Sequence, residues 1–311
     1  MAYKLSEINK RVLADPAEFT AECEAVFNGN VINTAEKIAA HSAVSPLVLL
    51  SGPSSAGKTT TANKICDALK KHGIRAHTIS LDNYFFTFNP ETAPKTKKGE
   101  YDFESPLCLD MALLNEHFRL LALGEEVNIP YFSFPDQARQ ESRATPMRLG
   151  TDAVAIFEGI HALNDAITAA SPAAFKLYIN ARSNIDESGK TLFKSTWTRL
   201  VRRVVRDERF RGTRAQLTLD MWANVRRGEK KYISPFKNRA DVIFDTSMPY
   251  EIPVMKNFAN ASLIEVPSGS ERYEELRGIL PALSRFEALD EKHVPEDSIL
   301  REFIGGGKYA Y

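Results

Sequence analysis

The eight residues from Gly52 to Thr59 read Gly-Pro-Ser-Ser-Ala-Gly-Lys-Thr and fit the pattern G-x-x-x-x-G-K-[ST] of a P-loop. An apolar run at 46–50 precedes them, and a helical pattern at 58–72 follows. This context predicts a buried strand that leads into the loop and a helix whose positive N-terminus faces an anion. The two glycines permit a backbone in which successive N–H groups point inward. The segment therefore predicts a site for a nucleoside triphosphate.

Several side chains of this loop have functions that follow from their chemistry. Lys58 is long enough to reach the β- and γ-phosphates, and the Thr59 hydroxyl is a ligand for Mg²⁺. The residues expected to bind the nucleotide are Gly52, Ser54, Ser55, Ala56, Gly57, Lys58, Thr59 and Thr60.

Composition excludes several other classes of protein. The chain has 40 basic and 40 acidic residues, so no overall charge attracts nucleic acid or a membrane surface. Three cysteines, far apart at 23, 66 and 108, argue against a disulfide framework or a zinc site and suit a reducing cytosol. No secretory signal is recognisable, and no apolar run approaches the roughly 18 residues of a membrane helix. We expect a cytoplasmic protein that binds neither membrane nor nucleic acid.

Strands and helices alternate beyond the loop. Strands are expected at about 46–51, 76–81, 153–157, 175–179 and 240–244, with one more considered at 262–266. Helices are expected at 58–72, 111–123 and 192–210, with Asp110 as an N-cap and with Gly73 and Gly124 as helix ends. An irregular stretch at 129–150 is compatible with a hairpin. This alternation predicts an α/β fold of the P-loop NTPase type, with a parallel sheet flanked by helices.

Two carboxylates are expected at the ends of strands. Asp82 follows the strand after the P-loop helix, and Glu158 ends an uninterrupted apolar strand. Ligands of open α/β sheets bind beyond the carboxyl ends of the strands, where Asp82 could accept a proton or hold Mg²⁺. Asp82 could equally be a turn residue, and Glu158 a solvated strand end. The residues alone leave both choices open.

Residues 199–231 carry eleven Arg and Lys against four Asp and Glu, in a chain whose total charge is zero. Four arginines at 199, 202, 203 and 206 recur at the spacing of one helix face. The run could be a solvated face, an RNA-binding surface or a clamp on phosphates, because Arg forks match phosphate oxygens. The P-loop favours the clamp for at least two of these arginines. A GTPase is not expected, because the base-reading motif N-K-x-D is missing.

Taken together, these segments resemble the phosphoribulokinase/uridine kinase family, most closely its uridine (uridine-cytidine) kinases, over about 46–246. Besides the P-loop, the resemblance rests on Ser80-Leu81-Asp82-Asn83-Tyr84-Phe85, Tyr101-Asp102-Phe103-Glu104-Ser105-Pro106, Phe157-Glu158-Gly159-Ile160, the lid pattern R-x-x-R-D-x-x-x-R-G from Arg203 to Gly212, and the closing segments at 232–235 and 240–243.

The resemblance implies roles for individual residues. Asp82 would be the general base, and Thr59, Asp82 and Glu158 would hold Mg²⁺. Lys58 and the lid arginines Arg206 and Arg211 would act on the transferring phosphoryl group. Contacts with the acceptor would come from Tyr84, Phe103, Glu104, Phe132, Gln137, Arg139 and Arg203.

Among the departures from the family pattern, two lie near the expected base site. Phe132 stands where uridine kinases place a tyrosine near the base, and Gln137 stands about where they have a base-reading histidine. Both bear on the recognition of the base. Glu104 falls where the family has an aspartate that binds the ribose hydroxyls.

The sequence thus predicts a kinase that uses ATP and Mg²⁺ and phosphorylates the 5′-hydroxyl of a nucleoside such as uridine or cytidine. The alternatives are another small acceptor (a sugar phosphate, pantothenate or glycerate), a nucleotide-dependent RNA-binding or regulatory protein, or an ATPase switch. We expect a helical N-terminal extension at 1–45, a kinase domain at 46–268 with an Arg-rich helical lid at about 199–235, and a helical tail at 269–311. The extension is interpreted as a packing surface or as a contact between copies in a homo-oligomer.

Overall fold

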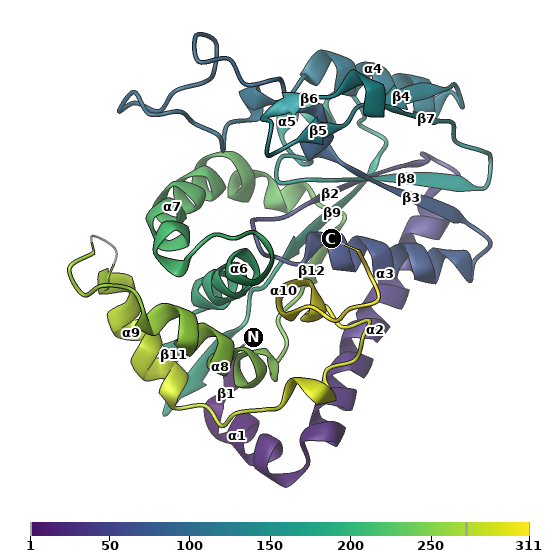
Figure 1. Cartoon of the computed structure of the whole chain (residues 1–311). Helices are drawn as coiled ribbons and strands as arrows, with labels where there is room; N and C mark the ends of the chain where they lie inside the picture. The colour runs from purple at the N-terminus through teal and green to yellow at the C-terminus, as the bar shows by residue number, and fades with distance from the viewer. Residues whose placement is uncertain (1, 271–272, 311) are drawn as a thin grey trace.

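The computed structural model describes residues 2–270 and 273–310 (Figure 1). At its centre lies a five-stranded sheet in the order β12-β9-β2-β8-β3, in which all neighbouring strands are parallel. Its strands are β2 (Leu47–Ser51), β3 (Arg75–Ser80), β8 (Ala153–Glu158), β9 (Phe175–Asn180) and β12 (Val242–Asp245). The α/β fold predicted from the sequence is confirmed.

Helices cover both faces of this sheet. The α-helices of the described residues are α1 (Leu5–Ala14), α2 (Pro16–His41), α3 (Lys58–Lys70), α4 (Met111–Ala122), α5 (Asp165–Thr168), α6 (Ser195–Phe210), α7 (Ala215–Gly228), α8 (Glu251–Ile264), α9 (Tyr273–Ser284) and α10 (Arg301–Ile304). The predicted caps are present: the Asp110 side chain accepts a hydrogen bond from the Leu113 N–H, and Gly73 and Gly124 have positive φ at the helix ends.

The central strands are buried on both sides, which explains why the sequence reads as continuous apolar runs. Val48 and Leu50 of β2 face a core formed with α2, α3, α6 and α8, whereas Leu47 and Leu49 face a second core formed with α4 and α5. Every residue of β2 and β8 is buried. Because the P-loop follows a strand that is fixed from both faces, the position of the loop is determined by the core.

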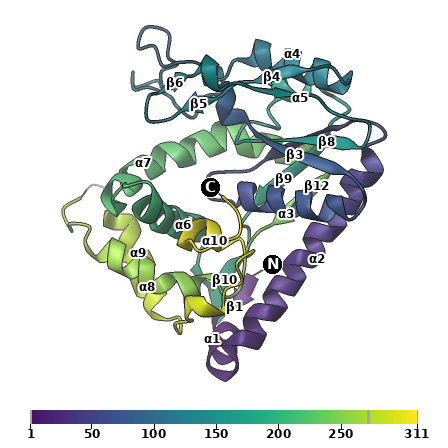
Figure 2. The ribbon, with the colours of Figure 1, turned by 45° about the vertical axis from the view of Figure 1, so that its right-hand side comes forward.

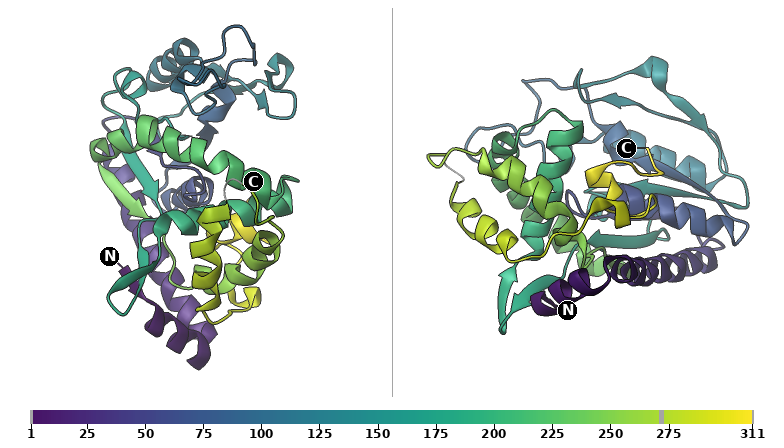
Figure 3. Two further views of the ribbon diagram at one scale, coloured as in Figure 1. Left: turned by 90° about the vertical axis from the view of Figure 1, so that its left-hand side faces the viewer. Right: turned by 60° about the horizontal axis from the view of Figure 1, so that its bottom comes forward.

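Smaller sheets lie at opposite ends of the molecule (Figures 1 and 3). The antiparallel pairs β4 (Val127–Ile129) with β7 (Thr145–Met147) and β5 (Phe132–Ser133) with β6 (Ala138–Arg139) lie beside α4, and the second pair is the hairpin considered for 129–150. At the other end, β1 (Ala2–Lys4), β10 (Asn184–Glu187) and β11 (Lys190–Phe193) form a three-stranded sheet.

Some expected elements differ from the structure. The strand considered at 262–266 is wrong, because α8 extends to Ile264 and buries Met255, Ala259 and Leu263 on one helical face. The helix expected from 192 begins at Ser195, since Leu192 and Phe193 belong to strand β11, in which Phe193 pairs with Ile185. In the described part of the tail, 269–270 and 273–310, helical structure is confined to α9, α10 and one short 3₁₀ turn at Glu291–His293.

Within residues 2–270 and 273–310, no helix combines the length and the apolar character that crossing a membrane would require. The two N-terminal helices pack against the domain: α2 lies along α3, and the two are neighbours in both Figure 1 and Figure 2.

Gly52, the first residue of the P-loop, tests how tightly the sheet fixes the loop. A Cβ at this position would lie 2.1 Å from the carbonyl oxygen of Ile179 in β9. Gly52→Ala should therefore lower the free energy of unfolding by about 1–3 kcal/mol or more, through overpacking. Gly29→Ala in α2 is the matched control, because no atom lies within 4 Å of its Cβ position, and it should be neutral or stabilising by up to about 1 kcal/mol. Urea denaturation measures both, and equal effects would contradict the prediction.

Candidate active site

The P-loop joins the end of β2 to α3, and of its two glycines only Gly57 has a positive φ, whereas the other left-handed residue is Ser55. Ser55 and Gly57 have φ of 58° and 80°, and Gly57 precedes the first residue of α3. The loop's carbonyl oxygens accept hydrogen bonds from the protein: Thr246 Oγ1 donates to Ala56 at 2.7 Å, and Arg199 donates to Ser54 at 3.2 Å. Because the carbonyls are bound from one side, the loop and the helix N-terminus can present N–H groups on the other.

Two of the four regularly spaced arginines are structural. Arg199 pairs with Glu229 at 2.7 Å, and Arg202 pairs with Glu251 at 2.7 Å, with all four side chains buried. Arg202 also donates to the Ser55 carbonyl at 3.4 Å. Removing one partner would leave an uncompensated buried charge, which is strongly destabilising. These two arginines bind P-loop carbonyls and buried glutamates, so neither is available for the expected phosphate clamp.

Three further arginines converge on the buried carboxylate of Asp207. Its oxygens lie 3.2 Å from Arg203 Nε, 3.2 Å from Arg206 Nε and 3.4 Å from Arg211 Nη1. Arg203 also donates to Ser54 Oγ in the P-loop at 2.9 Å. One carboxylate thus holds three guanidinium groups together beside the loop. The sequence pattern contained Asp207, but we assigned it no role in the site.

The two predicted carboxylates lie at the same edge of the sheet. Glu158 is paired in register with Ser80 and with Leu50, so its side chain emerges where β2 and β3 end. Asp82 follows in a 3₁₀ turn, where Ser80 Oγ accepts a hydrogen bond from its N–H at 3.2 Å. Both carboxyl groups lie near enough to Lys58 for its charge to affect them, and Glu158 is affected in the same way by Asp82. The structure therefore brings these predicted residues together.

Burial determines the acidity of both carboxyl groups. Desolvation raises the pKa of Glu158 to about 7, and the nearby charge of Asp82 adds to this while Lys58 opposes it. Desolvation also raises the pKa of Asp82, against Lys58 and Arg211. A carboxylate with a raised pKa is a better proton acceptor, and two carboxylates that repel each other gain stability from a bound cation.

The donor set fits Mg²⁺ as it occurs in nucleotide sites. Mg²⁺ is usually held by one or two carboxylates together with substrate phosphates and water. Thr59 at the start of α3, Asp82 and Glu158 supply one hydroxyl and two carboxylates. Among the residues that the structure describes, no group of three or more His, Cys, Asp or Glu side chains forms a ready-made cage. The phosphates of a nucleotide would have to complete the coordination.

A cavity of about 590 Å³ is lined by residues that include Phe85, which follows Asp82 by three positions in the chain. Six phenylalanines dominate its wall, and Gln137 and Asn89 contribute polar atoms. Its lining residues are Phe85, Phe86, Thr87, Phe88, Asn89, Thr92, Ala93, Pro94, Phe103, Leu107, Cys108, Phe132, Phe134 and Gln137. Among the predicted acceptor residues, Phe103, Phe132 and Gln137 therefore share one pocket.

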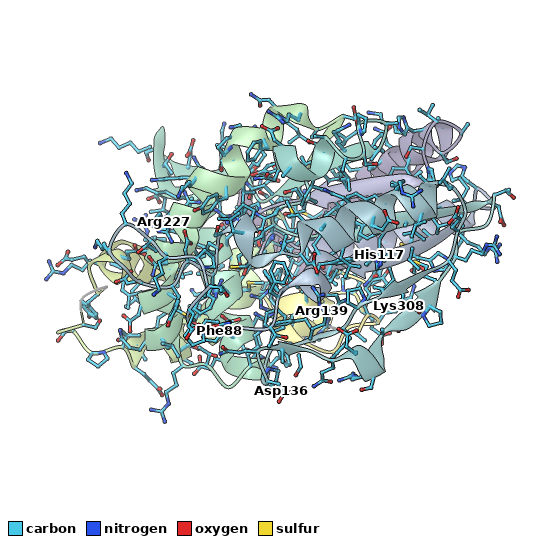
Figure 4. All side chains as sticks on the ribbon, turned by 90° about the horizontal axis from the view of Figure 1, so that it is seen from above. Phe88, His117, Asp136, Arg139, Arg227 and Lys308 are labelled. Carbon is cyan, nitrogen blue, oxygen red and sulfur yellow. The ribbon has the colours of Figure 1, made fainter. Side chains whose placement is uncertain are left out.

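Two predicted acceptor residues have other roles. Tyr84 is fully buried, hydrogen bonds to His117 Nδ1 at 2.9 Å and does not line the pocket. Arg139, labelled in Figure 4 with Phe88 and His117, is paired with Asp110 at 3.1 Å and donates to the carbonyls of Tyr84 and Phe85. These contacts make Arg139 a support for the pocket wall and not a member of its lining.

The segment around Glu104 connects the pocket to the lid. Glu104 interacts electrostatically with Arg203 and Lys58, and desolvation raises its pKa to about 7. Gly228 leaves room for it, because a Cβ there would lie 2.4 Å from the Glu104 Cβ. The neighbouring Asp102 accepts two hydrogen bonds from Arg227, at 2.9 and 3.2 Å. Asp102 was not predicted, since only the folded chain brings it to α7.

The shifted pKa of Glu158 predicts a pH-dependent stability in the absence of nucleotide and metal. Between its ordinary value of 4.5 and about 7, the folded protein retains a proton that the unfolded chain has released, so stability falls as the pH rises. Glu158→Gln should remove this loss, on the order of 2–3 kcal/mol. Urea denaturation at pH 5 and pH 8 measures it. A wild-type protein whose pH dependence matches the variant's would contradict the assignment.

Comparison with known proteins agrees with this geometry. The profile of the Phosphoribulokinase / Uridine kinase family matches residues 47–252. A uridine-cytidine kinase 2-B from Danio rerio is 28% identical over 205 residues, which cover 63% of this chain and 71% of the relative. A uridine kinase from Halobacterium salinarum is 26% identical over 226 residues, covering 72% and 87%. A uridine kinase from Saccharomyces cerevisiae is 27% identical over 256 residues, covering 80% of this chain but 46% of the relative.

The match to the family extends from the P-loop strand through the lid to the start of α8, well over half of the chain. The P-loop, both strand-end carboxylates and the clustered arginines lie within it. The chain belongs to the phosphoribulokinase/uridine kinase family and is a phosphotransferase with a hydroxyl acceptor.

Proposed function

We propose that the protein transfers the γ-phosphoryl group of ATP to the 5′-hydroxyl of a nucleoside. The observation that carries this proposal is the aromatic cavity, whose wall includes Phe85, three residues after Asp82 in the chain. An acceptor seated there would have its flat base among phenylalanines and its hydroxyl toward the carboxylate cluster. Every relative described above is a uridine or uridine-cytidine kinase, which supports the same acceptor class.

Each group in the site has a defined task in this proposal. The P-loop N–H groups and Lys58 hold the triphosphate in line with the acceptor. Asp82 takes the proton of the attacking hydroxyl, and the new O–P bond forms as the bond to ADP breaks. Arg206 and Arg211 stabilise the charge on the transferring group, and Glu104 accepts hydrogen bonds from the sugar hydroxyls. Bound Mg²⁺, held by Thr59, Asp82 and Glu158, would neutralise charge on the phosphates.

The arrangement of charges supports a sugar-phosphate acceptor or an RNA-binding role less well than a nucleoside acceptor. A sugar phosphate would carry a second anion, yet six phenylalanines dominate the pocket wall, and hydrophobic walls disfavour an unpaired charge. An RNA-binding role would need the arginines of the 199–231 run to be available. Arg199, Arg202 and Arg227 are instead paired with carboxylates of the same chain.

The first test identifies the acceptor. We expect purified protein with Mg²⁺ and ATP to release ADP when a nucleoside is added, and not with sugar phosphates, pantothenate, glycerate or no acceptor. ADP release measured against this panel decides between the alternatives. A preference for a phosphorylated or aliphatic acceptor would contradict the nucleoside proposal but leave phosphoryl transfer intact.

Asp82 and Lys58 provide the test of the chemistry. Asp82→Asn should lower kcat by about 10²–10⁴ and leave the Kd for ATP nearly unchanged, because only the proton acceptor is lost. Lys58→Ala should abolish transfer by removing the cation at the phosphates. Steady-state kinetics together with calorimetric ATP binding separate the two effects. Near-normal turnover of the Asp82 variant would exclude it as the base.

Phe132 tests the acceptor pocket. Its ring lies against Phe85 at 5.5 Å and Phe134 at 5.3 Å between ring centroids, so its truncation opens the wall. Phe132→Ala should raise the KM for the acceptor about tenfold through lost aromatic contact, without changing the KM for ATP. Both constants come from the same ADP-release measurement. A rise in the KM for ATP alone would place Phe132 outside the acceptor site.

A further inference from the structure

The C-terminal segment after α9 returns to the P-loop helix. This segment comprises residues 290–310. Its short helix α10 lies between α6 and α3, as Figures 1 and 2 both show. Lys64 Nζ of α3 contacts Asp297 Oδ2 at 2.6 Å, and Lys308, labelled in Figure 4, contacts Asp67 Oδ2 at 2.7 Å. The segment is thus anchored to α3 both before and after α10.

The same segment packs against the P-loop itself. A Cβ at Gly57 would lie 2.2 Å from Ile299 Cδ1, so Ile299 fills the space that the missing side chain leaves. Phe303 lies under the Arg202 guanidinium, 5.1 Å from its carbon to the ring centroid. Both apolar side chains are fully buried. Their packing determines where the residues between them can point.

Glu302, which lies between them, points its carboxylate at the N-terminus of α3. Its Oε2 accepts hydrogen bonds from the Thr60 hydroxyl at 2.7 Å and from the Thr60 N–H at 3.3 Å. Arg206 Nη1 lies 3.9 Å from its other oxygen. A helix N-terminus, a hydroxyl and a guanidinium form an environment that also suits a phosphate.

We propose that Glu302 occupies a phosphate position of the nucleotide site, so that the C-terminal segment closes this site until the nucleotide displaces it. This inference rests on the proposed ATP site. The Thr60 donors and Arg206 cannot serve the carboxylate and a phosphate together, and two anions placed there would repel each other. Nucleotide affinity is then reduced by the fraction of molecules in which Glu302 is seated.

Glu302→Gln tests the proposal, because it keeps the shape of the side chain and removes the charge that binds the helix N-terminus. The matched control is Glu296→Gln, the same change at an exposed position of the same segment. We expect the Kd for ATP, and for inorganic triphosphate, to fall about tenfold in the first variant and to stay unchanged in the second. Calorimetry without Mg²⁺ gives these values. A weaker affinity in Glu302→Gln would overturn the proposal and make Glu302 part of the nucleotide site.

Removing a negative charge could also strengthen anion binding without any movement of the segment, so a second readout is needed. Hydrogen exchange of the amides at 298–305 should become faster in the wild-type protein when ATP binds, because displacement exposes them. Slower or unchanged exchange would overturn the proposal even if Glu302→Gln binds ATP more tightly.

Lys58→Ala distinguishes a failure of the proposed ATP site from a failure of the closing role of Glu302. If it abolishes ATP binding while Glu302→Gln behaves as wild type, the nucleotide site stands and the closing role of Glu302 is wrong. If neither the wild type nor Glu302→Gln binds ATP or triphosphate, the proposed function fails together with the inference.

Discussion

The support of the P-loop backbone by buried arginines of α6 is the interaction on which the rest of this structure depends. A loop that directs its N–H groups at an anion leaves its carbonyls to be bound elsewhere. Arg199 and Arg202 bind the carbonyls of Ser54 and Ser55, and each is neutralised by a buried glutamate. Because these arginines lie on α6, this helix and the P-loop are parts of one hydrogen-bonded unit.

The same helix divides its charge between structure and chemistry. Arg199 and Arg202 form buried ion pairs. Next to the loop, the Asp207 carboxylate contacts three other guanidinium groups, those of Arg203, Arg206 and Arg211. A carboxylate that holds three cations fixes their positions without neutralising them all. The net positive charge beside the P-loop thus comes from a cluster with one acidic centre, which a count of charges along the sequence does not reveal.

Two carboxyl groups at the edge of the sheet, Asp82 and Glu158, are both desolvated and repel each other when ionised. Desolvation raises the pKa of both Asp82 and Glu158, and Lys58 opposes the rise in each case. Such a cluster is more stable when a cation or a proton is present, so binding of a cation there would be coupled to protonation. Glu302 adds a further negative charge near Glu158 and so belongs to the same electrostatic system.

The amino-acid sequence by itself determined the parallel α/β fold, the P-loop and the two strand-end carboxylates. These features arise from local signals: apolar periodicity, glycine at fixed spacing, and the rule that parallel strands end at one edge of a sheet. Even the helix caps at Asp110 and Gly73 could be predicted, because capping depends on neighbouring residues. Local signals failed at 262–266, where an apolar run that resembles a strand ends helix α8 because it packs against the core.

Only the tertiary structure decided how similar residues divide their roles. Arg199 and Arg203 lie on one helix with the same chemistry, yet one is buried in an ion pair and the other reaches the P-loop hydroxyl. Tyr84 lies in a segment that the family resemblance assigns to the acceptor site, but its side chain is buried and hydrogen bonds to His117. The contact of Glu302 with Thr60 joins residues 242 positions apart. Burial and long-range contact depend on how the whole chain packs, and no local pattern encodes them.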